Sequence, residues 1–352
     1  MCDHRDIGEI SIDRRAFLRR GAAAGAIAVA VPMGFSNGQA QAAGAFKATH
    51  GSGFCNSAFF ITHAKQLGKE YGLTLEFVNT PTFAEIVTFL GAGLVDVSVL
   101  PYTSFIGLYD KGAPVKIVGG GGIEGCVIVV QPIVVQPGLD TAAKLKGKTL
   151  GTFQMDTLEV LPYDWLKKNG VKFSDITVRY MGNTPEAVEA FKAGALDFIC
   201  TIEPYASALL NDVKGSVLLS NGVDIYGPHY TDCVLAARTS VIEEHPEDLK
   251  ALIKGMLKAQ LMFEQQREQI LSELVGTYYK TSLENARIGA QRQPPCVDQR
   301  AQTDFILGRV DSILEMGYIK KKPGHDAIDW TLLEKAIKEV PEVYSQLKYK
   351  SA

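Results

Sequence analysis

Residues 80–102, TPTFAEIVTFLGAGLVDVSVLPY, and residues 184–205, TPEAVEAFKAGALDFICTIEPY, carry the same signals in the same order. Each begins with Thr-Pro, runs through an apolar helical pattern to a Gly, reaches an Asp three residues later, and ends in an apolar run and Pro-Tyr. Proline suits the first turn of a helix because it lacks the amide hydrogen that would be unpaired there, and glycine commonly ends helices. The repeat predicts two α/β units of related construction.

The residues around the first copy alternate between predicted strands and helices. The strands are expected at 45–49, 73–78, 95–100 and 115–118, and the helices at 58–71, 83–90 and 102–110. Strands separated by helices of this length form βαβ units, in which neighbouring strands pair in parallel. We therefore expect an α/β fold.

Composition excludes several classes of protein. The chain has 352 residues, 46% of them hydrophobic and 21% charged, which suits two globular domains. Its 36 Lys and Arg against 39 Asp and Glu leave no basic surplus for a phosphate backbone, so nucleic acid is not expected as a partner. Six cysteines without a Cys-x-x-Cys pair argue against a disulfide-stapled scaffold or a zinc finger.

The first 42 residues have the features of a targeting segment. Residues 11–19, SIDRRAFLR, contain paired arginines, residues 21–34 are mildly apolar but too short to span a bilayer, and residues 40–42 offer a small-x-small cleavage site. This segment resembles a twin-arginine signal peptide, which implies a mature periplasmic chain beginning near Ala43. The alternative is an amphipathic helix, for which the Ala/Gly-rich run offers little apolar area.

Three further motifs carry a family resemblance. Residues 145–151 (LKGKTLG), 193–197 (AGALD) and 203–206 (EPYA) resemble those of periplasmic substrate-binding proteins of ABC importers, in the branch that serves nitrate, sulfonates, taurine and thiamine-type pyrimidines. The resemblance implies the type II two-lobed fold, with the lobes joined by two crossover strands near 126–132 and 232–237 and closing around a ligand. It places residues 43–127 and 235–352 in lobe 1 and residues 128–234 in lobe 2, with the C-terminal helices packed on the first lobe.

The ligand contacts are expected where strands lead into helices. In open α/β sheets the binding crevice lies at the carboxyl ends of the strands, and this rule selects three loops from each lobe. The predicted contacts are Ser52, Phe54, Cys55, Asn56, Thr80, Tyr102, Thr103, Gln154, Asp156, Thr157, Asn183, Glu203, Tyr205 and Tyr230. Helix capping is the alternative role for Ser57, Thr82, Asp156 and Thr184.

The charge of these loops predicts the class of ligand. None of the six contains Arg or Lys, whereas Glu124, Asp156, Glu203 and Asp232 fall at or near predicted strand ends. An enclosed anion is usually matched by charged donors, so we expect a neutral or cationic molecule. Aromatic residues in the same stretches could sandwich a planar or cationic group, or could pack in the core: Phe54, Tyr102, Phe153, Tyr205, Tyr226 and Tyr230.

Four cysteines fall in the same zone, at positions 55, 126, 200 and 233. They could bind a soft metal or a sulfur-containing ligand, pack as small apolar residues, or, for Cys126 and Cys233, form a disulfide. No His-x-x-x-His or Glu-x-x-His pair is present in the mature chain, which argues against a dedicated histidine metal site. We therefore expect no dedicated metal ligand and no cofactor.

Together these features predict a monomeric periplasmic solute-binding component of an ABC import system. It would capture a small organic nitrogen- or sulfur-containing molecule, deliver it to an ABC permease, and not act as an enzyme. Two alternatives remain: an enzyme similar to the pyrimidine synthase that shares this fold, and a periplasmic sensor. An export signal argues against the enzyme because such biosynthesis is cytoplasmic, but it does not separate a sensor from a transporter component.

Overall fold

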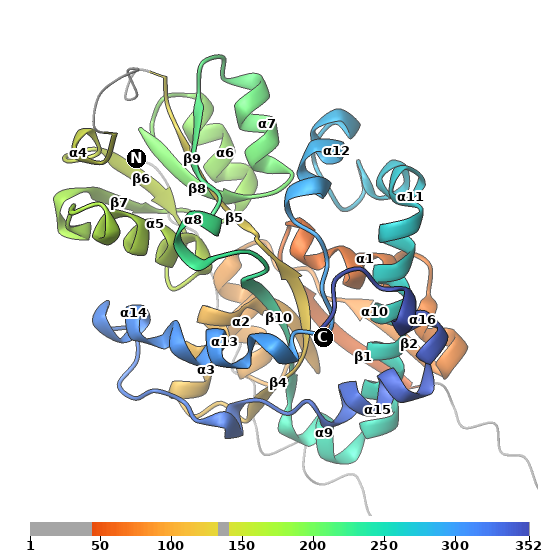
Figure 1. Ribbon diagram of the computed structural model, residues 1–352. Helices are drawn as coiled ribbons and strands as arrows, with labels where there is room; N and C mark the ends of the chain where they lie inside the picture. The colour runs from red at the N-terminus through yellow and green to blue at the C-terminus, as the bar shows by residue number, and fades with distance from the viewer. Residues whose placement is uncertain (1–43, 133–140, 352) are drawn as a thin grey trace, which may run out of the picture. The chain divides into compact units, whose positions relative to one another are not determined.

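The computed structural model describes residues 44–132 and 141–351, so the predicted signal segment lies outside the described residues (Figure 1). The first of two five-stranded sheets has the order β2-β1-β3-β10-β4. Its strands are β1 (Gly44–His50), β2 (Leu73–Phe77), β3 (Val97–Pro101), β4 (Val115–Ile123) and β10 (Thr231–Arg238). Strands β2, β1 and β3 pair in parallel, and β10 is antiparallel to both β3 and β4.

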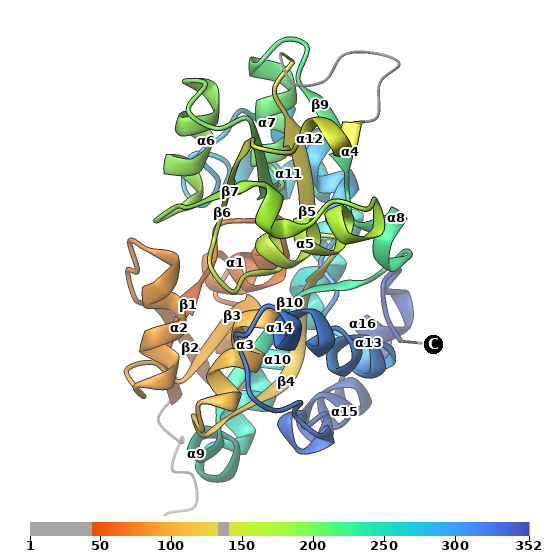
Figure 2. The same cartoon turned by 90° about the vertical axis from the view of Figure 1, so that its left-hand side faces the viewer.

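The second sheet has the order β7-β6-β8-β5-β9. Its strands are β5 (Cys126–Val130), β6 (Thr149–Thr152), β7 (Thr177–Tyr180), β8 (Phe198–Ile202) and β9 (Val217–Ser220). As in the first sheet, three parallel strands are followed by one antiparallel strand, which here is β5, the strand that precedes them in the sequence. The predicted two-lobed α/β fold is confirmed, and Figure 2 shows the two sheets in separate groups of elements.

The internal repeat is visible in the turn between a helix and the next strand, and in the hydrogen bond that this turn makes with the neighbouring strand. Helices α2 (Phe83–Gly91) and α6 (Thr184–Lys192) are each followed by a glycine, Gly93 or Gly194, at φ 73°. Only glycine adopts this left-handed conformation without steric cost. Asp96 then accepts a hydrogen bond from the backbone N–H of Lys47 at 2.9 Å, and Asp197 accepts one from that of Thr149 at 2.8 Å.

Helices cover both faces of the first sheet. Helices α1 (Ser57–Ala64) and α10 (Pro246–Gln265) share one apolar cluster with Val97 and Val99 of β3. Leu100 joins the opposite cluster with residues of α2, α3 (Tyr102–Asp110) and α14 (Val310–Glu315). Strand β3 is fully buried because it packs on both sides, as its uninterrupted apolar sequence predicts.

Three elements of the first lobe differ from the sequence-based expectation by more than one residue at a boundary. The predicted helix 58–71 is α1 followed by a break at Gln66, whose φ of 52° is left-handed, and a separate 3-10 helix at Leu67–Tyr71. Strand β3 begins two residues later than expected. Strand β4 continues to Ile123 because the glycines that follow Val118 still pair with β10.

A single apolar cluster holds the second lobe together. Its helices are α4 (Thr141–Lys144), α5 (Thr157–Lys168), α6, α7 (Tyr205–Asp212) and α8 (Val223–Tyr226), with a 3-10 turn at Phe173–Asp175. None of the helices in the described ranges 44–132 and 141–351 is long and apolar enough to cross a membrane.

The C-terminal elements contact both lobes. They include α9 (Thr239–Glu244), α11 (Arg267–Leu274), α12 (Leu283–Arg292), α13 (Thr303–Gly308), α15 (Thr331–Glu339) and α16 (Pro341–Gln346), with 3-10 turns at Arg300–Gln302 and His325–Ala327. Helix α10 packs on α1, as expected for the first lobe, but α12 lies against α7 and α14 against α5. The chain passes between the sheets after β4 and again after β9, and the predicted lobe boundaries at 127/128 and 234/235 stay a prediction.

Candidate functional site

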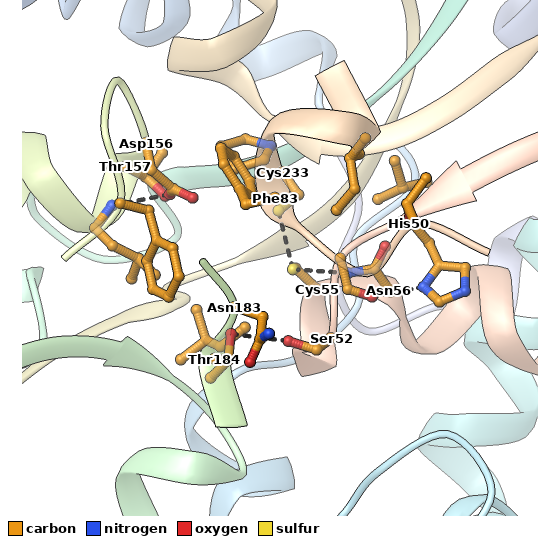
Figure 3. A pocket seen from close by; sticks show the side chains of 18 of the residues that line it. His50, Ser52, Cys55, Asn56, Phe83, Asp156, Thr157, Asn183, Thr184 and Cys233 are labelled. Carbon is orange, nitrogen blue, oxygen red and sulfur yellow. Dashed lines mark hydrogen bonds between the residues drawn. The ribbon is translucent and has the colours of Figure 1, made fainter. Parts of the chain in front are cut away.

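A cavity of about 430 Å³ opens between the loops of the two sheets (Figure 3), within the range of small-molecule sites. The first lobe contributes the loops after β1 and β2 and the start of β10, and the second contributes the loops after β6 and β7. The lining residues are His50, Gly51, Ser52, Cys55, Asn56, Thr80, Pro81, Thr82, Phe83, Ile86, Val99, Pro101, Phe153, Asp156, Thr157, Leu158, Asn183, Thr184, Pro185, Ile202, Asp232, Cys233 and Tyr278. None of these is Lys or Arg.

On the first-lobe wall, the loop after β1 turns through a 3-10 helix, Phe54–Asn56, into α1. Ser57 fixes this turn because its hydroxyl donates to the Phe54 carbonyl at 2.6 Å. Asn56 is fully buried, and its amide Nδ2 donates to Cys55 Sγ at 3.3 Å. Its Oδ1 has no hydrogen-bond partner, so the wall presents an unpaired acceptor.

On the second-lobe wall, Asp156 caps α5 by accepting the Leu158 N–H at 3.0 Å. The Thr157 hydroxyl lies 3.0 Å from Asp156 Oδ1 and 2.8 Å from Asp232 Oδ1. A hydroxyl has one hydrogen, so it can donate to only one of these carboxyl groups at a time. Burial raises the pKa of Asp156 to about 7, with a smaller contribution from the charge of Asp232, and burial also raises the pKa of Asp232. The carboxyl groups of Asp156 and Asp232 therefore retain a proton up to a higher pH than an exposed aspartate does.

Three of the four predicted thiols converge on Asp232. Cys55 Sγ and Cys233 Sγ are 2.9 Å apart, and the thiols of Cys126 and Cys233 each lie 3.5 Å from an Asp232 oxygen. Burial raises the pKa of the Cys55 thiol to about 11 and also raises the pKa of the Cys233 thiol well above its usual value. All five cysteines in the described part of the chain are free, and Cys200 lies in the second-lobe core.

Hydrogen bonds of ordinary length join the two lobes around the cavity. The Ser52 hydroxyl donates to Thr184 Oγ1 at 3.0 Å, and the Phe54 N–H donates to the Glu203 carbonyl at 2.9 Å. The carbonyl of Met155 accepts from the hydroxyls of Thr103 and Ser104 at 3.1 and 2.9 Å. The described conformation is thus one in which the loops of the two lobes touch.

Half of the predicted contact residues lie on the cavity wall. They are Ser52, Cys55, Asn56, Thr80, Asp156, Thr157 and Asn183. Of the four proposed caps, Thr82 and Asp156 cap their helices, whereas Asn56 rather than Ser57 stands in the cap position of α1 and Asn183 rather than Thr184 caps α6. The capping and cavity-lining roles coincide at Thr82, Asp156 and Asn183.

Four predicted aromatic contacts pack in the cores instead. Phe54 lies 4.5 Å from the ring of Tyr279 in the first-lobe core, and Tyr102 packs against Phe305. Tyr205 belongs to the second-lobe core. The Tyr230 hydroxyl donates to the Asn221 carbonyl at 2.9 Å. The alternative of core packing fits these residues because their rings fill the space beneath the loops.

The other three predicted contacts also lie off the cavity wall. Thr103 bonds to Met155 across the lobes, and Gln154 is exposed to solvent. Glu203 is fully buried, with Arg292 Nη1 2.9 Å from one oxygen and the Ser207 N–H 2.9 Å from the other. Glu203 therefore ties α7 to the end of α12.

The sequence rule missed several wall residues. Phe83 directly follows the cap of α2, and Leu158 follows the cap of α5 by two residues, so extending the rule into the first helical turn would have found both. His50 ends β1, and burial lowers its pKa. No signal near the predicted loops indicates Tyr278, which reaches the cavity from the segment after α11 and lies 2.6 Å from His63 Nδ1.

The chain is similar in sequence to proteins that are named as binding proteins. It is 26% identical over 204 residues to a Brucella abortus (strain 2308) protein named, by inference, a binding protein; the match spans 57% of this chain and 60% of that relative. It is 25% identical over 246 residues to a Brachyspira hyodysenteriae protein named, by inference, an ABC transporter periplasmic binding protein, over 65% of this chain and 69% of the relative.

The fold is similar to that of the alkanesulfonate-binding protein SsuA from Xanthomonas axonopodis pv. citri bound to MOPS. The TM-score is 0.71 at 18% identity, with 82% of this chain and 99% of that structure covered. The model of the NMT1-like family matches residues 52–274, which is more than half of the chain. The chain therefore belongs to the NMT1-like family.

Proposed function

We propose that the protein is the solute-binding component of an ABC import system and encloses one small organic molecule between its lobes. The observation that carries the proposal is the cavity of about 430 Å³, walled by strand ends and helix starts of both lobes. The names of the Brachyspira relative and of the similar SsuA structure support it. Delivery to a membrane permease by a monomer is part of the same proposal.

The proposed ligand is neutral or cationic and contains nitrogen or sulfur. Asp156 and Asp232 lie on the cavity wall at 3% and 1% exposure, and the wall has no Lys or Arg to balance an anion. Desolvating an anion beside buried carboxyl groups is unfavourable without such donors. The alkanesulfonate named for the similar SsuA structure therefore does not carry over to this chain.

The cavity offers binding contacts rather than a catalytic constellation. Its polar side chains are hydroxyls, amides, thiols and carboxyl groups, several of which cap helices or join the lobes, and the imidazole of His50, whose Nδ1 lies 2.7 Å from the Gly51 carbonyl. We favour capture of a solute over pyrimidine synthesis on this basis and on the names of the relatives. Presence of permease and ATPase genes beside this gene would favour import over a sensor.

Binding is tested with the mature chain, beginning at Ala43. A solute that binds only the folded protein stabilises it by about 2.7 kcal/mol at a hundredfold excess over Kd. A thermal-shift screen of pyrimidines, amines, taurine, alkanesulfonates, nitrate and sulfate should find a stabilising compound among the neutral or cationic members. Small-angle scattering should then show no extended open form in the bound state, and tight binding of nitrate or an alkanesulfonate would contradict the charge argument.

A matched pair of variants tests the location. Thr80→Val replaces a cavity hydroxyl with a methyl group and should weaken binding of the stabilising compound. Thr88→Val makes the same change on the exposed side of α2 and should leave the affinity unchanged. Equal effects of the two variants would place the ligand elsewhere.

Export is proposed to use the twin-arginine route to the periplasm. The pathway reads the arginine pair specifically, so replacing Arg14 and Arg15 with Lys should keep the precursor in the cytoplasm. Fractionation of cells that produce either precursor measures this. Normal periplasmic accumulation of the double variant would show that another route suffices.

A further inference from the structure

We propose that Cys55, Cys233 and Asp232 form a binding site for a divalent thiophilic metal ion of the zinc class in the cavity wall. One ligand atom from each residue lies within 4.8 Å of the others, and all three side chains are buried. Thiolate sulfur and carboxylate oxygen are donors that zinc takes in proteins. All three residues line the cavity, which gives an ion a path to the site (Figure 3).

A run of glycines in β4 brings the two thiols together. A Cβ atom at Gly122 would lie 2.6 Å from Cys55 Cα, and one at Gly121 would lie 2.8 Å from the Cys55 carbonyl and 3.2 Å from Cys233 Cβ. Any larger residue at these two positions would push the turn that carries Cys55 away from β10. The glycines therefore permit the close approach of segments that are 178 residues apart in the sequence.

Hydrogen-bond donors surround the three ligands. The Asn56 amide donates to Cys55 Sγ at 3.3 Å, the Gln293 amide to Asp232 Oδ2 at 2.9 Å, and the Thr157 hydroxyl lies 2.8 Å from Asp232 Oδ1. Such partners orient metal ligands and stabilise their charged forms. A tetrahedral ion needs a fourth ligand atom. Asn56 Oδ1, which is fully buried and has no hydrogen-bond partner, is one ligand atom that the chain offers for this position. An atom of an enclosed solute is the other.

Charge balance favours a divalent ion. One M²⁺ ion that displaces the protons of two thiols forms two metal–sulfur bonds and releases two protons to solvent, so the net charge of the buried site does not change. Two sulfur atoms bound at about 2.3 Å in a tetrahedral site lie about 3.8 Å apart. The sulfur atoms, now 2.9 Å apart, must therefore separate by about 0.9 Å, which rotation of the Cys55 side chain on its short turn can supply.

Calorimetry with zinc alone tests the site on the reduced, tag-free mature chain, independently of any solute. We expect one ion per chain, a Kd below about 1 µM, and release of about two protons when buffers of different ionisation enthalpy are compared. Cobalt(II) should add a thiolate-to-metal absorption band. Binding weaker than about 10 µM, or a cobalt complex without that band, would overturn the proposal.

Variants locate the ion. Cys55→Ser and Cys233→Ser should each weaken zinc binding at least a hundredfold, whereas Cys296→Ser should leave it unchanged. Cys296 is a matched control because it is a buried, free thiol whose hydrogen bond, to the Asp298 carbonyl at 3.4 Å, lies outside the cavity. An equal effect of all three variants would overturn the site. If a variant fails to fold, the cobalt band of the unaltered chain decides.

A disulfide is the competing state of the same two sulfur atoms. The mature chain purified without reductant should give five reactive thiols after denaturation, since Cys2 is removed with the signal segment. Three thiols, with a Cys55–Cys233 disulfide identified by peptide mapping, would overturn the metal site. Failure of solute binding with intact zinc binding would affect only the proposed function.

Discussion

The two lobes are built alike but present different chemistry to the cavity. In both, an aspartate after the positive-φ glycine accepts a backbone hydrogen bond from the neighbouring parallel strand. At the first loop of each lobe, however, the residue before the helix is Asn56 in one and Asp156 in the other. At the third, Leu100 of the first lobe corresponds to Glu203 of the second. The repeat thus maintains the frame, while one substitution within it places a carboxyl group on the second wall at Asp156 and another buries Glu203 off the wall, where it ties α7 to α12.

The largest effect is expected from making the second wall like the first with Asp156→Asn. The pKa of Asp156 is raised from 3.8 to about 7 by burial, so the folded state keeps a proton that the unfolded chain releases above pH 4. Stability from this group is present below pH 4 and lost as the pH rises to 7, by at most about 4 kcal/mol. The variant has no such loss.

Urea unfolding at pH 4, 5.5 and 7 measures this difference. The free energy of unfolding of Asp156→Asn should rise relative to that of the unaltered protein as the pH rises. Asn56→Ala, the matched change on the first wall, alters no titrating group and should give a constant offset. The free energies of unfolding of Asp156→Asn and of the unaltered protein could instead differ by the same amount at all three pH values. That result would show that Asp156 is ionised throughout.

The second-largest effect is expected from Glu203→Leu, which gives the third loop of the second lobe the residue that the first lobe has at Leu100. The substitution removes a fully buried carboxylate and leaves Arg292 without its partner. Because Arg292 is still 32% exposed, we expect a loss of about 3 kcal/mol, at the lower end for a broken buried pair. The double variant Glu203→Leu/Arg292→Leu should recover part of it. Unchanged stability of the single variant in urea unfolding would contradict this role.

The third pair compares the aspartates of the two repeats. Asp96→Ala should lower the free energy of unfolding by about 2 kcal/mol. The substitution removes both the hydrogen bond from the Lys47 N–H and the ion pair with Arg238 at 2.6 Å. Asp197→Ala should cost about 1 kcal/mol, since its Lys148 partner is 3.6 Å away and 41% exposed. Unfolding free energies that are equal, or in the reverse order, would show that Arg238 contributes nothing.

The smallest effect is expected from Gly93→Ala and Gly194→Ala. Both glycines have φ 73°, which costs an L-residue about 1 kcal/mol, so the two variants should lose the same amount. Gly308→Ala is a control, because a Cβ there meets no atom within 4 Å and Gly308 lies in helix α13. A loss confined to one repeat would mean that the two turns are not equivalent.

The repeat and its flanking alternation of strands and helices predict most of the frame, because glycine, proline and capping residues act locally. Helix α3 matches its predicted range, and α2 differs by one residue. The sequence does not predict the break at Gln66, because residues 58–71 keep an apolar pattern through it, with Leu67 just after the break buried in the first-lobe core.

Only half of the predicted contacts lie on the cavity wall, for a similar reason. Strand ends lie close together by the topology of a parallel sheet, so residues such as Asn56, Asp156 and Asn183 follow from position alone. Which way an aromatic ring at a strand end turns depends on the space left by distant segments. Tyr102 turns toward Phe305 and Phe54 toward Tyr279, and both partners come from the C-terminal third of the chain, where no local pattern marks them.

The position of β10 has a consequence for the order in which the lobes form during synthesis. Strand β4 has no pairing with β3 and joins the first sheet only through β10, which begins 108 residues after β4 ends. The strands of the second sheet, from Cys126 to Ser220, need no later strand to complete it. On a ribosome, the inserted lobe can therefore close its sheet while the lobe that begins the chain still waits for its fifth strand, β10.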